Sequence, residues 1–164
     1  MSKTPTASQT WIVLARCYKS LSTLVEHSIA EKGLCLSDFM ILEALLHKGH
    51  LTITEIQGKV LLATGSMTAA VDRLERKGHI ARKTTPEDRR ARRLELTPRG
   101  RNLISEVFEA HNRDLESWMS SLTRTEKQQT YELLKKLGLS AASIHEAGIR
   151  APTKEDGHGR RSKK

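Results

Sequence analysis

The sequence predicts a mainly α-helical protein with one small β-hairpin. Apolar residues recur at helical spacing along most of the 164 residues. Capping signals and glycines divide these stretches into pieces of ordinary helix length. Strand-like segments occur in one place only, on either side of a Pro-Glu-Asp turn sequence.

The first two helices are expected at 9–32 and within 36–49 (LSDFMILEALLHKG). Gly33 is expected to end the first, and Ser37 to be the N-cap of the second. The apolar face of the first helix consists of Leu14, Cys17, Tyr18, Leu21, Leu24, Val25 and Ile29.

Two shorter helices are expected next. The stretch TITEIQGKVLL opens with Thr52 and Glu55 at the spacing of a capping box. The stretch ATGSMTAAVDRLERKG ends at Gly78. Its buried face is expected to consist of Met67, Val71 and Leu74.

A hairpin and two long helices are expected to complete the fold. Residues 79–85 and 91–96 are its strands, joined by 86–90. Thr97 and Pro98 form an N-cap and a first helical residue, and a second capping box starts at Thr123. The apolar faces of these helices are Leu103, Val107, His111, Leu115, Trp118 and Leu122, then Tyr131, Leu134 and Leu137.

This order of elements indicates a winged helix-turn-helix core, with the hairpin as the wing, flanked by N- and C-terminal dimerisation helices. We therefore expect one domain at 9–142. The other boundaries are 36–100 for the winged helix-turn-helix, 9–32 and 98–142 for the dimerisation helices, 1–8 for a flexible N-terminus, and 143–164 for a basic, disordered tail.

Composition excludes several classes of protein. No apolar run is long enough to span a membrane, and two cysteines make neither a disulfide framework nor a zinc set. The start of the sequence also lacks the apolar run of a signal peptide, so we expect a cytoplasmic protein. The histidines lack metal-ligand spacing, so we expect no metal, and we expect no cofactor. The net charge of +9 is concentrated in 73–101, which holds 11 Lys/Arg and 4 Asp/Glu. Such a patch is typical of a polyanion-binding surface.

The sequence from Leu61 to Gly100 contains a series of motifs, namely Gly65-Ser66-Met67-Thr68, Asp72-Arg73-Leu74-Glu75, Lys77-Gly78, Asp88-Arg89-Arg90 and Leu96-Thr97-x-x-Gly100. With these motifs, and with LSDFMILEALLHKG as a further match, the sequence resembles the MarR family of bacterial transcription regulators over about 10–142. The resemblance implies an α-helical homodimer that controls nearby genes, usually by repression, and that a small molecule or an oxidant releases from DNA.

Two segments are expected to contact DNA. Small residues at the start of the fourth helix allow it to approach the major groove closely. The arginines further along this helix either contact phosphate or lie on an ordinary solvated face. At the wing, Arg90 suits the minor groove, and Asp88 is expected to orient it or to fix the turn. The expected DNA-binding residues are Thr64, Gly65, Ser66, Thr68, Ala69, Arg73, Arg76, Asp88, Arg89 and Arg90.

Two alternatives stay open for Arg92. It is a phosphate neighbour like Arg89 and Arg93, or it faces inward and pairs with an acid, because it shares the strand phase of Leu94 and Leu96.

The first and last helices are too apolar on one face for the small core of a winged helix. A partner subunit is the expected cover, so the protein should be a homodimer on a pseudo-palindromic operator of double-stranded DNA.

The resemblance implies a small aromatic or lipophilic effector. Its pocket would be lined by Trp11, Phe39, Met40 and His111, although such residues more often belong to the core. Cys17 is expected to be a buried structural thiol rather than a redox sensor. For Cys35, the sequence offers no evident basic neighbour.

The residues thus favour a sequence-specific DNA-binding regulator. A winged helix that binds RNA or protein is the alternative, as is a cysteine-based redox regulator. An enzyme is not expected, because no nucleophile with a paired base, no carboxylate dyad and no phosphate-binding loop is present.

Overall fold

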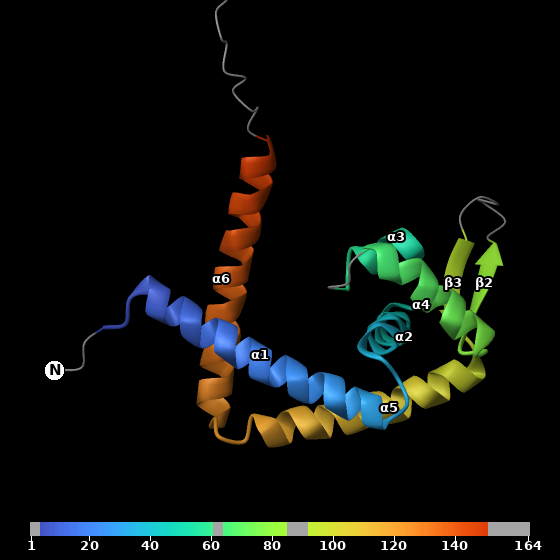
Figure 1. Cartoon of the computed structure of the whole chain (residues 1–164), viewed down its shortest axis with the longest axis horizontal. Coiled ribbons are helices and arrows are strands. Elements are labelled where there is room, and N and C mark those ends of the chain that lie inside the picture. The colour runs from blue at the N-terminus through green and yellow to red at the C-terminus, as the bar shows by residue number, and fades with distance from the viewer. Residues whose placement is uncertain (1–3, 61–63, 85–91, 151–164) are drawn as a thin grey trace, which may run out of the picture. The chain divides into compact units, whose positions relative to one another are not determined.

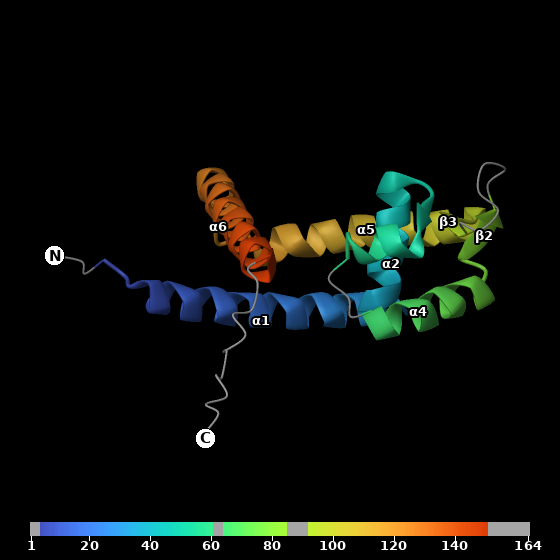
Figure 2. The same ribbon diagram turned by 90° about the horizontal axis from the view of Figure 1, so that it is seen from above.

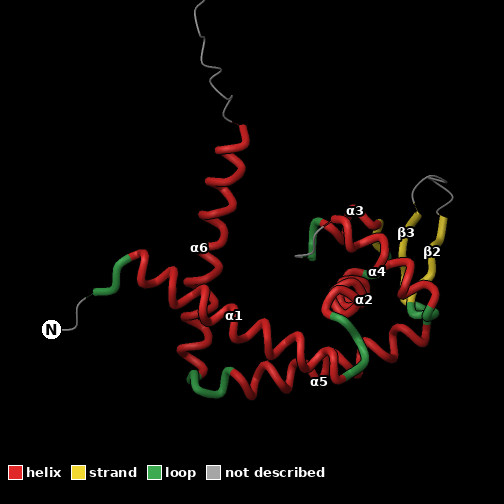
Figure 3. The backbone as a smooth tube through the Cα atoms, in the orientation of Figure 1, coloured by secondary structure: helices red, strands yellow, loops and turns green. Residues whose placement is uncertain are grey.

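The protein is described here from a computed structural model, which covers residues 4–60, 64–84 and 92–150. The chain divides into two compact units, Met1–Ser117 and Trp118–Lys164. The elements in chain order are α1 (Ala7–Glu31), α2 (Leu36–Lys48), β1 (Leu51–Thr52), α3 (Ile53–Gln57), α4 (Thr64–Arg76), β2 (Ile80–Thr84), β3 (Arg92–Leu96), α5 (Pro98–Trp118) and α6 (Arg124–Arg150) (Figure 1). The predicted mainly helical fold is confirmed, and the strands occupy one small region of the first unit (Figure 3).

The strands form one antiparallel sheet in the order β1-β3-β2. β2 and β3 are the predicted hairpin, paired from Ile80↔Leu96 to Thr84↔Arg92. The short strand β1, which pairs Leu51 with Leu94, was not predicted. Two residues are too few to show alternation, so no local pattern indicates this strand.

The core of the first unit lies where α2 packs against its neighbours. Seen from above, α2 runs between α1 and α5 (Figure 2). The ring of Phe39 on α2 meets that of His111 on α5 edge-on at 5.0 Å between centroids. The buried apolar residues are Ile29, Leu34, Phe39, Ile41, Leu42, Leu45, Leu51, Ile56, Val60, Met67, Ala70, Val71, Leu74, Ile80, Leu94, Ile104 and Val107. They include the predicted face of α4, which is confirmed.

Most predicted helix ends are confirmed. Gly33, Gly49 and Gly78 follow α1, α2 and α4 with φ between 71° and 78°, a region that glycine enters without strain. The N-cap of α2 is Cys35, so the prediction of Ser37 is wrong. The amide of Phe39 donates to the carbonyl of Cys35 at 3.0 Å, which starts the first turn two residues earlier.

The junction between α4 and α5 explains the Thr97-x-x-Gly100 motif. The hydroxyl of Thr97 donates to the carbonyl of Gly78 at 2.7 Å and accepts from the amide of Gly100 at 3.0 Å. A Cβ on Gly100 would lie 1.9 Å from the carbonyl oxygen of His79. Gly100 is thus required by space rather than by its backbone angles.

The second unit contains α6. The predicted capping box is confirmed: the Glu126 amide donates to the Thr123 hydroxyl at 3.3 Å, and the Thr123 amide donates to the Glu126 carboxylate at 2.7 Å. The helix continues to Arg150, so the predicted disordered tail is wrong for 143–150. These residues contain no proline, and the first proline that follows is Pro152.

The predicted flexible N-terminus is also wrong in part. α1 begins at Ala7, and Thr6 and Gln9 form a reciprocal capping box in front of it. Among the described residues, no helix is both long and apolar enough to cross a membrane.

Candidate nucleic-acid interface

α4 presents one polar face to solvent. Met67, Ala70, Val71 and Leu74 are buried on the opposite side. The exposed residues include three that the sequence assigned to DNA contact, namely Thr68, Ala69 and Arg76. A helix with small residues and an arginine on its free face can approach the major groove of DNA closely.

Other predicted contacts lie outside the described part of the structure. α4 begins at Thr64, but the side chains of Thr64, Gly65 and Ser66 are not described. Asp88, Arg89 and Arg90 at the wing also lie outside the described residues. Their roles remain predictions from the sequence pattern.

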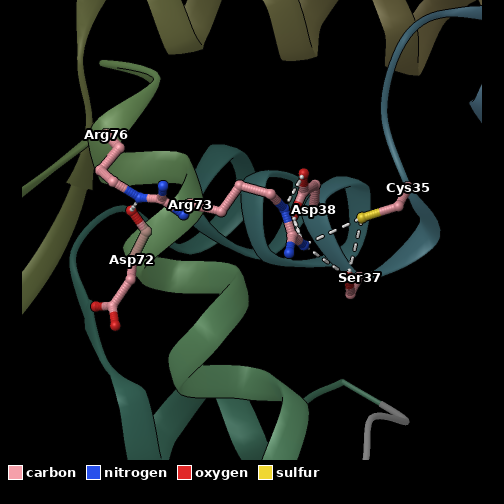
Figure 4. A network of polar contacts seen from close by, with 6 residues as sticks. All are labelled: Cys35, Ser37, Asp38, Asp72, Arg73 and Arg76. Carbon is pink, nitrogen blue, oxygen red and sulfur yellow. Dashed lines mark hydrogen bonds and ion pairs between the residues drawn. The ribbon is translucent and has the colours of Figure 1, made fainter.

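Arg73 turns away from the exposed face of α4 and toward α2 (Figure 4). Its Nε donates to both carboxylate oxygens of Asp38, at 3.1 and 3.0 Å, and its Nη2 donates to one of them at 2.5 Å. The same Nη2 donates to Cys35 Sγ at 3.2 Å and to Ser37 Oγ at 3.3 Å. Hydrogen bonding to Asp38 raises the pKa of the Arg73 guanidinium above its ordinary value.

This arrangement corrects the expectation for Cys35. The sequence suggested no basic neighbour, but Arg73, 38 positions along the chain, contacts its sulfur. Packing of α2 against α4 brings the two residues together, which no local pattern indicates.

A second arginine joins α4 to the wing. Arg82 on β2 donates through Nη2 to Asp72 and through Nη1 to Glu75, the latter at 2.5 Å. This contact was not predicted, although the sequence contains a signal for it. Arg82 shares the strand phase of the buried Ile80, and Asp72 and Glu75 are three residues apart on the adjacent helix.

The described part of the wing carries exposed positive charge. Arg92 and Arg93 are exposed on β3, whereas Lys83 is paired with Glu95 at 2.5 Å. The alternative in which Arg92 faces inward is therefore wrong. It lies at the end of the strand, beyond the core that covers Leu94.

The four predicted effector residues have different surroundings. Phe39 and His111 contact each other and are buried, while Trp11 is 67% exposed. Met40 lines a hollow of about 370 Å³, together with Glu43, Ala44, His47, Lys48, Lys59 and Val60. Burial raises the pKa of the Glu43 carboxyl above its ordinary value, while His47 opposes this effect.

Two other features concern single side chains. Cys17 is exposed, so its prediction as a buried thiol is wrong within this chain. Within the described residues, Nδ1 of His79 and of His111 has no hydrogen-bond partner, and burial lowers the pKa of both histidines.

Comparison with known proteins identifies the family. The MarR family model matches residues 34–91. The curated relative MhqR of Bacillus subtilis, an HTH-type transcriptional regulator, is 37% identical over 135 residues, or 82% of this chain and 93% of MhqR. The chain belongs to the MarR family. It is thus a DNA-binding transcriptional regulator, and α4 with the β2–β3 wing is its MarR-type winged helix.

Solved structures show that the MarR fold covers most of the chain. Bordetella bronchiseptica BpsR, in a study of how 6-hydroxynicotinic acid regulates its DNA binding, has a TM-score of 0.71 at 23% identity, over 84% of this chain and 98% of BpsR. A cysteine-to-serine mutant of Escherichia coli MarR, complexed with operator DNA, has a TM-score of 0.67 at 22% identity, over 81% and 99%. These two likenesses establish the fold.

Proposed function

We propose that the protein is a transcriptional repressor, which binds a pseudo-palindromic operator as a homodimer in the cytoplasm and leaves it when a small molecule binds. The observation that carries this proposal is the exposed face of α4, with Thr68, Ala69 and Arg76, in a chain whose wing bears exposed Arg92 and Arg93. Its relative MhqR is a regulator of transcription, which supports a role without catalysis.

In this proposal α4 enters the major groove. Thr64, Gly65, Ser66, Thr68 and Ala69 lie at the base edges and adjacent phosphates, because these side chains are small enough for the helix to approach. Arg76, further along the helix, contacts phosphate. At the wing, Arg90 enters the minor groove, Asp88 orients it and Arg89 contacts phosphate.

Exposed apolar side chains support the homodimer. Trp11 and Tyr18 on α1 are about two-thirds exposed, and so are several aliphatic residues of α6. Large exposed apolar side chains along a helix are typical of a face that an interface covers. A two-fold dimer would present its two α4 helices about one DNA turn apart, which predicts the inverted repeat in the operator.

An effector that is aromatic or lipophilic fits the same scheme. BpsR is regulated by 6-hydroxynicotinic acid. Trp11, Phe39, Met40 and His111 are the proposed lining. Of these four residues, Met40 borders the hollow of about 370 Å³ beside α2, which is the part of the proposed site that a small ligand could enter.

The test uses the wild-type protein and a duplex that it selects from a random-sequence library. We expect an inverted repeat in the selected duplex, a dimer on it, no binding to RNA of the same sequence, and affinity that falls steeply between about 50 and about 200 mM salt. A monomeric, salt-insensitive complex, or preference for RNA, would contradict the proposal.

The wing is tested on the same duplex. Arg90→Ala should weaken binding by about 1–3 kcal/mol with an unchanged Tm. Asp88→Ala should also weaken it, and the double mutant should be non-additive, because Asp88 has nothing to orient without Arg90. Tighter binding by Asp88→Ala would leave the wing as a diffuse basic patch without the orienting role.

A further inference from the structure

We propose that Arg73 and Arg82 are positioning residues, which fix the recognition helix α4 between α2 and the wing and do not themselves touch DNA. Arg73 was expected to contact phosphate, like Arg76. The proposal rests on the DNA-binding function proposed above. It assigns different roles to two arginines of α4, since Arg73 positions the helix and Arg76 contacts phosphate.

Two nitrogens of the Arg73 guanidinium, Nε and Nη2, are engaged inside the chain, although 34% of the side chain is exposed. The Asp38 side chain is only 1% exposed, and Arg73 supplies the charge that balances it through three contacts of 2.5 to 3.1 Å. A buried carboxylate without a partner is costly. Turning Nε and Nη2 of Arg73 toward a phosphate would leave Asp38 unpaired, so the geometry favours the internal contact.

The planar fork of Arg73 also fixes a direction. Nε and Nη2 face Asp38, and Nη2 reaches Cys35 and Ser37 at the start of α2 (Figure 4). Apolar residues of both helices also meet in the core, among them Met67, Val71 and Leu74 of α4. Apolar packing tolerates small sliding and rotation, whereas a bidentate pair sets one register.

Arg82 does the same on the other flank of α4. It joins β2 to Asp72 and Glu75, so the wing and α4 are tied together. The neighbours Asp72 and Arg73 are therefore engaged with different elements. The side chains of Asp72 and Glu75 are 49% and 36% exposed, more than that of Asp38, so we expect Arg82 to contribute less than Arg73 to fixing α4.

Arg76 is the matched control. It lies three residues after Arg73 and is exposed, and its Nε donates to the carbonyl of Asp72 at 3.4 Å. A phosphate contact and a positioning contact differ in two measurable ways. Loss of a phosphate contact weakens binding to all sequences and lowers the salt slope by about one per site. Loss of positioning weakens the specific complex and leaves the slope unchanged.

The experiment measures affinity and salt slope for the full chain on two probes, the duplex that wild type selects and a random-sequence duplex of equal length. For Arg73→Lys and Asp38→Asn, we expect a loss of about tenfold or more on the selected duplex, no change on the random duplex, and a wild-type salt slope. Arg82→Lys should show the same pattern with a smaller loss. Arg76→Met should weaken both complexes alike and lower the slope.

Asp38→Asn gives the sharpest result, because the two readings predict opposite signs. If Arg73 bound phosphate, removing the carboxylate would free it and tighten binding on both duplexes. Tighter binding by Asp38→Asn, wild-type affinity of Arg73→Lys, or a lower slope in Arg73→Met would overturn the proposal. Should Arg73→Met fail to fold, Arg73→Lys and Asp38→Asn decide alone.

Failure of the function itself gives a different result. If wild type selects no duplex, DNA binding is contradicted whatever the variants do. If wild type selects a duplex and Arg73→Met behaves like Arg76→Met, only the positioning role is lost.

Discussion

The two ends of α1 carry the same apolar stripe in different surroundings. Ile29 near its C-terminal end is fully buried against the core, whereas Tyr18 and Trp11 on the same face are 66% and 67% exposed. α6 resembles the exposed end, since Leu134, Leu137 and Ile144 share one face and are between 45% and 70% exposed. Helical periodicity thus identifies an apolar face but not what covers it.

This difference distinguishes positions that are packed within the chain from positions that are exposed in it. In the packed region, formed by the end of α1, α2 to α4, the sheet and the start of α5, each position is constrained by neighbours in the same chain. The N-terminal half of α1 in the first unit, and α6 in the second, each carry exposed apolar side chains, so substitutions there should act mainly on association with a second subunit. Four matched pairs of substitutions test the distinction.

The largest contrast is expected between two glycines. Gly100→Ala should lower the free energy of unfolding by about 3 kcal/mol or more, because the new Cβ would collide with the backbone of His79. Gly138→Ala on α6 meets no atom within 4 Å and should raise stability by about 0.5–1 kcal/mol. Urea unfolding of both variants measures this, and equal effects would remove the distinction.

The next pair lies on the apolar stripe of α1. Ile29→Ala should cost about 3 kcal/mol at every protein concentration, because it leaves a cavity in the core. Tyr18→Ala should lower the apparent stability only where wild type is dimeric, so its effect should vanish on dilution. Unfolding curves over a range of concentrations distinguish the two. A concentration-independent loss in Tyr18→Ala would argue that the chain itself covers this residue.

A smaller effect should appear in the pH dependence of stability. Burial lowers the pKa of His111 below 6.5, and Lys32 adds to this while Asp114 opposes it. As the pH falls below about 6.5, the unfolded chain takes up the proton first, so stability should decrease until the folded-state pKa is passed.

Substitution of His111 tests that dependence. His111→Phe keeps an aromatic ring against Phe39 and should reduce the loss of stability between about pH 7 and about pH 5. His79, whose pKa is also lowered, retains its own contribution. His145→Phe, at an exposed position on α6, is the control. An unchanged pH profile in His111→Phe would show that other groups set it.

The smallest effects are expected for the cysteines. Cys35→Ser keeps an acceptor for Arg73, and Cys17 is exposed on α1, so each serine variant should stay within about 0.5 kcal/mol of wild type. DNA binding and any response to peroxide or quinone should also be unchanged. If wild type leaves the selected duplex on oxidation and one variant does not, that cysteine is a sensor.

The sequence by itself determined most of the local structure. Helix ends could be predicted because they depend on residues within one turn of each other. They include the glycines after α1, α2 and α4, the capping boxes at Thr52 and Thr123, and the Thr97-Pro98 helix start. The strands of the wing followed from their alternation around a turn. The family motif indicated the outward face of α4, where Thr68, Ala69 and Arg76 are exposed.

Only the tertiary structure decided which charges are free. Arg73 and Arg76 each follow an acidic residue on α4. Arg73 is nevertheless paired with the buried carboxylate of Asp38 on α2, whereas Arg76 is exposed. The inward-facing arginine that pairs with acids is Arg82 rather than Arg92, because the core lies beneath Leu94 and does not reach the first residue of β3. β1, the contact of Cys35 with Arg73, and the need for Gly100 all arise between segments far apart in the chain. Local periodicity carries no information about such contacts, since it describes one element at a time.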